Sequence, residues 1–90
     1  MLMLEVKLVK MYKNENADKL KAYADIMIGE VIEIRGCKLI QGDKGLFVGL
    51  PRQKGKNEQW FPVVKIHDDE LFREIQYVVK EGYKEKDKNV

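Results

Sequence analysis

The sequence predicts an α+β fold, in which a bent antiparallel sheet of four to five strands carries a C-terminal helix packed on it. Two observations lead to this prediction. The first half of the chain places apolar residues at every second position, and the residues after Asp68 place them at helical spacing. Ninety residues allow one thin core. We therefore expect a single domain over residues 1–90.

The alternating pattern of a half-buried strand occurs in four segments, residues 2–12, 20–28, 31–41 and 46–50. The first two are joined by a turn rich in Asn and Asp at residues 13–18. In the third segment the apolar parity changes at Gly36, which predicts a β-bulge that keeps both halves of the strand on the core. Pro51 ends the fourth segment, because proline cannot donate to a strand ladder.

The segment after Pro51 has a different character. Residues 52–57 contain no hydrophobic side chain and include Gly55, so we expect an exposed, mobile loop there. The apolar run at residues 60–64 contains Pro62, which predicts an edge strand or an extended segment.

The last segment has the periodicity of an amphipathic helix. Asp68 is the expected N-cap, and the acidic residues that follow complement the helix dipole. Gly82 is the expected end of the helix. Residues 83–90 are charged, and we expect them to be frayed.

The composition argues against catalysis and metal binding. The chain has no Ser and no Thr, so it lacks hydroxyl nucleophiles of the usual kind. Cys37 and His67 are the single residues of their types, too few for a structural zinc site, and Cys37 is expected to be a small buried apolar residue. We expect no enzyme activity, no cofactor, no metal and no small-molecule substrate. A lone cysteine and the lack of a signal or membrane segment favour the cytoplasm.

Positive charge is concentrated in one part of the chain, although the net charge is only +2. Residues 51–66 carry four basic side chains and one acidic one. Such a cluster is typical of phosphate contacts, although a solvated loop that keeps the protein soluble is the alternative. The candidate nucleic-acid-binding residues are Arg52, Lys54 and Lys56 in the loop, with Lys44 adding to that patch, and Lys80 and Lys84 near the helix end.

Three aromatic residues near this cluster, Phe47, Trp60 and Phe61, have the rings needed to stack on bases. Their apolar neighbours favour packing in the core or in a dimer instead. The strands also supply more apolar surface than one short helix covers, which predicts a homodimer.

The segment at residues 39–51, LIQGDKGLFVGLP, resembles the signature of the SpoVG (septation protein, stage V sporulation protein G) family. The order of elements over about residues 4–82 is similar as well. The resemblance implies a homodimeric bacterial regulator that binds DNA, and in some relatives RNA, and influences septation and sporulation. It also implies that the helix end varies the DNA preference. The alternative function is that of an adaptor of the division machinery that binds proteins and not nucleic acid.

Overall fold

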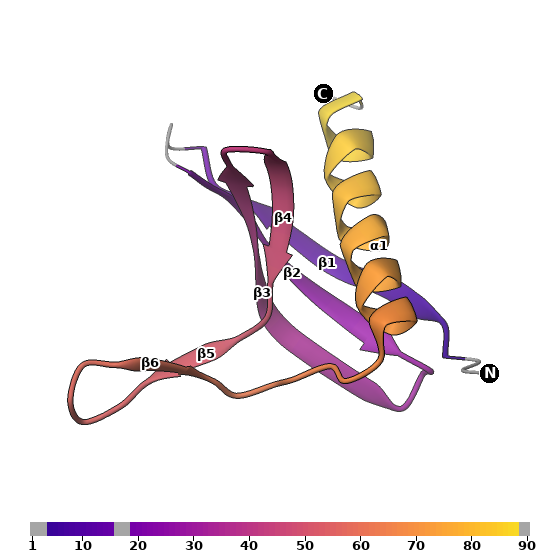
Figure 1. The fold of residues 1–90 in the computed structure, drawn as a ribbon. Helices are drawn as coiled ribbons and strands as arrows, with labels where there is room; N and C mark the ends of the chain where they lie inside the picture. Colours follow the sequence, from indigo (N-terminus) through magenta and orange to yellow (C-terminus); the bar gives the residue numbers. More distant parts are fainter. Residues whose placement is uncertain (1–3, 16–18, 89–90) are drawn as a thin grey trace.

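The computed structural model describes residues 4–15 and 19–88 (Figure 1). Its elements follow the chain as β1 (Val6–Lys13), β2 (Leu20–Ile28), β3 (Ile32–Gly42), β4 (Gly45–Gly49), β5 (Arg52–Lys54), β6 (Trp60–Pro62) and α1 (Asp69–Lys88). Residues 2 and 3 of the first predicted strand, residues 16–18 of the predicted turn and residues 89 and 90 of the tail lie outside the described residues.

Strands β1 to β4 form one antiparallel sheet in chain order, and α1 lies against one of its faces (Figure 1). Strands β5 and β6 pair with each other in a separate two-stranded sheet. The predicted α+β class is confirmed. Each of the four alternating segments forms a strand of the main sheet.

The core fills the space between α1 and the sheet face that it covers. Alternate residues of each strand and one face of the helix enter it, as their periods of two and 3.6 residues require. The buried apolar residues are Val6, Met11, Ala22, Ala24, Ile26, Ile28, Ile34, Cys37, Leu39, Val48, Leu71, Ile75 and Val79.

The predicted bulge at Gly36 is confirmed. The register of β2 and β3 shifts between Ala24 and Ile26, so that Asp25 faces two residues of β3 instead of one. Gly36 has a φ of 82°, a left-handed conformation that suits glycine, and its N–H donates to Asp25 Oδ1 at 3.0 Å. The bulge keeps the apolar side of both halves of β3 on the core.

Strand β1 contains a bulge that the sequence pattern does not predict. Its register against β2 shifts between Leu8 and Lys10, which leaves Val9 without a partner and 46% exposed. The bulge changes which alternate positions of β1 face the core. Even-numbered Val6 before it and odd-numbered Met11 after it are therefore both buried. The alternation of the first eight residues gave no sign of this change.

Helix α1 begins where the sequence predicts but ends later. The N-cap is confirmed, because Asp68 Oδ2 accepts a hydrogen bond from the backbone N–H of Leu71 at 2.7 Å. The predicted end at Gly82 is wrong, since the helix continues to Lys88. Gly82 serves packing instead, because a Cβ at this position would collide with the side chain of Leu8. Glycine lets the helix approach β1 closely.

The loop predicted at residues 52–57 is wrong for residues 52–54, which form β5 and pair with β6 in a hairpin, whereas residues 55–57 lie in the connection between the two strands. The Gly55 N–H donates to the Gln59 carbonyl at 2.8 Å, and Glu58 turns the chain with a φ of 61°. Two paired strands satisfy each other's backbone hydrogen bonds whether or not their side chains are apolar. The absence of hydrophobic residues at 52–57 therefore did not exclude a strand here. The edge strand expected at Pro62 is confirmed. The hairpin projects from the end of β4, away from α1 (Figure 1).

Candidate nucleic-acid interface

The hairpin presents the three basic residues predicted for the loop. Arg52 and Lys54 are alternate residues of β5 and so share one face, while Lys56 lies in the connection to β6. All three are exposed. Lys54 Nζ lies 3.2 Å from Glu58 Oε1 in a solvent-exposed ion pair. Three basic side chains and one acidic side chain leave residues 52–62 with a charge of +2.

Lys44 does not join this group. It lies in the turn before β4, whereas Arg52 follows β4, so the two residues are at opposite ends of that strand. The prediction that Lys44 adds to the loop patch is therefore wrong. Helix α1 and β4 lie beside each other and run in opposite directions, so the turn with Lys44 and the C-terminal turns of α1 point to the same end of the molecule (Figure 1).

The predicted site residues thus lie in two separate regions of the fold. We call them the hairpin group, Arg52, Lys54 and Lys56, and the helix-end group, Lys44, Lys80 and Lys84. Within the helix-end group, Lys84 Nζ lies 3.6 Å from Glu81 Oε2. Acidic side chains therefore offset charge in both groups.

A third region is the sheet face turned away from α1, which we call the open face. Tyr12 of β1 pairs in register with Tyr23 of β2, and Tyr23 pairs with Lys38 of β3. Because paired residues of an antiparallel sheet point to the same side, these three side chains form a row across the strands. Tyr12 is 49% exposed and Tyr23 is 40% exposed. Lys10 Nζ lies 5.7 Å from the centroid of the Tyr12 ring.

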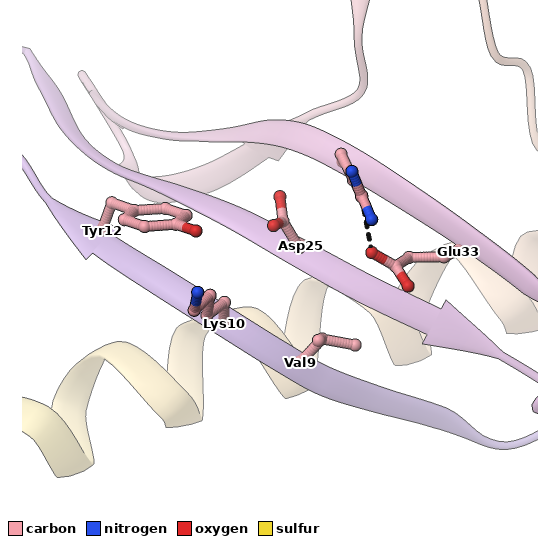
Figure 2. A pocket seen from close by; sticks show the side chains of 6 residues that line it. Val9, Lys10, Tyr12, Asp25 and Glu33 are labelled. Atoms are coloured by element: carbon pink, nitrogen blue, oxygen red, sulfur yellow. Dashed lines mark hydrogen bonds and ion pairs between the residues drawn. The ribbon is translucent and has the colours of Figure 1, made fainter.

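One hollow of about 400 Å³ lies on this open face, and Figure 2 shows the side chains that line it: Val9, Lys10, Tyr12, Asp25, Glu33 and Arg35. Its acidic groups have partners. Asp25 accepts a hydrogen bond from the backbone of the bulge, and Glu33 Oε2 accepts one from Arg35 Nε at 2.7 Å. The bond and charge of Glu33 raise the pKa of the Arg35 guanidinium.

A second hollow, of about 360 Å³, lies where the hairpin meets the open face. It is lined by Lys38, Ile40, Phe47, Gly49, Leu50, Arg52 and Trp60. Lys38 Nζ lies 5.8 Å from the Trp60 ring centroid, so the row of the open face continues onto the hairpin. This hollow joins the basic hairpin group to the aromatic sheet face.

The aromatic residues at this junction are not in the core of the protomer. Trp60 is 54% exposed, Phe61 is 47% exposed and Phe47 is 46% exposed. The prediction that they pack in the core is wrong. Their packing in a dimer stays a prediction.

The remaining chemistry-bearing residues form no further site. Cys37 is fully buried, as predicted, and burial together with the nearby charge of Asp25 raises the pKa of its thiol to about 11. The part of the chain that the structure describes contains no group of three or more His, Cys, Asp or Glu side chains placed to hold a metal ion. It also contains no helix with the length and apolar character needed to cross a membrane.

The chain is similar to known proteins over most of its length. The SpoVG family model matches residues 1–85. The chain belongs to the SpoVG family. A SpoVG relative from Fusobacterium nucleatum is 36% identical over 75 residues, covering 83% of this chain and 81% of the relative. One from Bdellovibrio bacteriovorus is 33% identical over 75 residues, covering 83% and 69%, and one from Archaeoglobus fulgidus is 28% identical over 85 residues, covering 94% and 100%. The names of these SpoVG relatives refer to septation and to no reaction.

The segment that resembles the SpoVG signature builds the junction between the sheet and the hairpin. Residues 39–51 comprise the end of β3, the turn, β4 and the link to β5. The Phe47 ring lies over Gly42, where a Cβ would come within 3.0 Å of it. The signature thus fixes the strand from which the basic hairpin projects.

Sequence reasoning missed the row of Tyr12, Tyr23 and Lys38. The signal was present, because these residues occupy the positions between the core-facing ones in three strands. Two bulges obscured it, since they change parity within β1 and β3. Charge counting along the chain gives no weight to lysines that are brought together by strand pairing.

Proposed function

We propose that this SpoVG family member is a nucleic-acid-binding regulatory protein of the cytoplasm, linked to septation, that binds DNA or RNA as a homodimer. The observation that carries the proposal is the projecting hairpin with its exposed Arg52, Lys54 and Lys56. Phosphate contacts need exposed cations, and this hairpin supplies three of them.

The energetic basis is the release of counterions. Each phosphate that a Lys or Arg side chain neutralises frees condensed cations into solution, which favours binding at low salt. Three basic residues per protomer become six in a homodimer. This number of contacts is sufficient for binding that does not depend on sequence.

The homodimer is supported by the apolar side chains that the hairpin leaves exposed. A two-stranded hairpin is marginally stable by itself, and it makes few contacts with the rest of the protomer. Phe61 and the neighbouring Val63 are 47% and 57% exposed. Packing of these residues against a second copy would stabilise the hairpin. Light scattering of the purified protein is expected to give twice the protomer mass of 10.5 kDa, and a stable monomer at low micromolar concentration would contradict the dimer.

A second candidate function is that of a protein-binding adaptor in the division machinery. It is favoured by the exposed apolar residues at the β2–β3 turn, where Val31 is 78% exposed and Ile32 is 54% exposed. An adaptor contact of this kind needs no basic hairpin. Its affinity depends little on ionic strength, because apolar contacts are not screened by salt.

The dependence of binding on salt separates the two functions. A mobility-shift series with a DNA duplex and an RNA of the same sequence is expected to show binding that weakens steeply from about 50 to 200 mM salt. Absence of binding to both nucleic acids at the lowest salt would contradict the proposal and favour the adaptor.

A further inference from the structure

We propose that the open face of the sheet is a platform for single-stranded nucleic acid, on which unpaired bases stack against Tyr12, Tyr23 and Trp60. This inference rests on the proposed function and names the class of ligand that the site takes. It assigns base contacts to the sheet face, whereas the hairpin group contacts the backbone.

The geometry of the row fits successive bases. Tyr12 and Tyr23 lie on neighbouring strands at paired positions, so their Cα atoms are about 5 Å apart. Both rings remain substantially exposed, so each offers part of its surface to a ligand. Every base has a flat π-face, so rings at this spacing accept stacked bases of any sequence.

The row continues toward the hairpin across β4, past the side chain of Ile40, which lies beside Gly49. Lys38 pairs with Gly49, which has no side chain to fill the open face on β4. The resulting hollow of about 360 Å³ is bordered by Trp60 and Arg52. A strand of nucleic acid that crosses from Tyr12 toward Trp60 therefore reaches the hairpin group at the end of its path.

The charges of the open face suit a polyanion. In the described part of the chain, no carboxylate lies within 4.0 Å of the charged nitrogens of Lys10, Lys38 or Arg52. Two acids share this face: Asp25 accepts a hydrogen bond in the bulge and is the register partner of Lys10, and Glu33 forms an ion pair with Arg35, so the cations outnumber the acids. Three cations beside exposed rings are the combination that single-strand binders use, in which cations follow the phosphates while rings hold the bases.

The same charges argue against the two other occupants of this face. A second copy packed symmetrically on it would bring two identical sets of cations together, and like charges across an interface weaken binding. A duplex keeps its bases stacked inside the helix and offers only their edges, which flat rings cannot stack on. Unpaired bases use both the rings and the lysines.

The test is binding of a fluorescein-labelled oligothymidylate of about 12 nucleotides, followed by anisotropy at fixed salt. Tyr12→Leu and Tyr23→Leu are each expected to weaken binding about 5- to 150-fold, because each removes one stacked base. Tyr23→Phe keeps the ring and is expected to retain the affinity. Phe72→Leu alters an aromatic residue of α1 that is 39% exposed and away from the open face, and it is the matched control.

Trp60 supplies an independent readout, because it is the one tryptophan of the chain. Stacking of a thymine on its ring is expected to quench its fluorescence in the wild type in proportion to binding. Circular dichroism of each variant verifies that the fold is retained, and light scattering gives its oligomeric state.

The possible results separate this inference from the proposed function. If the wild type binds neither the oligothymidylate nor a duplex, the proposed function and the platform both fail. If it binds but the folded Tyr12→Leu and Tyr23→Leu proteins bind equally well, the platform is wrong while the proposed function stands. If these substitutions convert a dimer to a monomer, the open face is a contact between copies and the platform is also overturned.

Discussion

Gln76 of α1 and Val48 of β4 are joined by two hydrogen bonds that close the free edge of the sheet. The Val48 N–H donates to Gln76 Oε1 at 2.8 Å, and Gln76 Nε2 donates to the Val48 carbonyl at 2.9 Å. Since β4 is the last strand of the main sheet, these backbone groups have no neighbouring strand. One side-chain amide thus takes the place of a paired residue, holds α1 against β4 and blocks strand addition at this point.

Replacing Gln76 by Leu is expected to destabilise the protein by about 1–3 kcal/mol. The substitution removes both hydrogen bonds and leaves the backbone of Val48, whose residue is only 3% exposed, without partners. Urea unfolding followed by circular dichroism measures the change. Gln53→Leu on the exposed hairpin is the matched control, with an expected change within about 0.5 kcal/mol. Equal unfolding midpoints for Gln76→Leu and the wild type would refute the role of this amide.

Gly82 and Leu8 are expected to be energetically coupled, because a Cβ at position 82 would collide with the Leu8 side chain. Alanine favours a helix by about 1 kcal/mol over glycine. Gly82→Ala should therefore stabilise a Leu8→Ala protein by about that amount, and should stabilise the wild type less or destabilise it. A double-mutant cycle of urea unfolding free energies measures the coupling. Equal effects of Gly82→Ala in both backgrounds would show that the contact has no influence.

Much of the fold was predictable from local patterns, and the errors have physical causes. Alternation located the four strands of the main sheet, and the parity change at Gly36 located its bulge. Gly82 was misread because a glycine that ends a helix and a glycine that lets a helix pack closely look alike in the sequence. The distinction depends on Leu8, which is 74 residues away, and no local rule includes such a contact.

The candidate site was predictable only in part. Charge counting along the chain found Arg52, Lys54 and Lys56, which are close in sequence. It placed Lys44 with them because it ignored β4, the short strand that separates Lys44 from Arg52 in space. The row of Tyr12, Tyr23 and Lys38 depends on the register of three strands, which bulges shift by one residue in places.

Cys37 is expected to resist modification in the folded protein. Its side chain is fully buried and its thiol pKa is raised to about 11, so little thiolate is present or accessible at pH 8. A chromogenic disulfide reagent should react slowly with the native protein and rapidly in urea. Rapid native labelling at a rate independent of protein stability would contradict the burial.

The raised pKa of Cys37 also predicts the direction of a pH effect. The folded protein retains the thiol proton that the unfolded chain loses near pH 9, so this contribution to stability is complete below about pH 9 and is lost as the pH rises toward 11. Unfolding free energies measured across this range should fall more steeply for the wild type than for Cys37→Ala. Parallel curves for the two proteins would count against the shift.

The most direct test of the central claim, nucleic-acid binding through the projecting hairpin, compares salt dependence in two sets of variants. Replacing Arg52, Lys54 and Lys56 together by Ala should weaken binding to all duplex sequences alike. It should reduce the slope of log affinity against log salt by about 0.9 per lost phosphate contact, or about 5 for six residues in a dimer. Folding should survive, because exposed charges contribute little to stability. The account predicts this loss for the triple variant and a smaller one for Lys80→Ala/Lys84→Ala. Full affinity and an unchanged slope in the triple variant, with both lost in the helix-end variant, would contradict it.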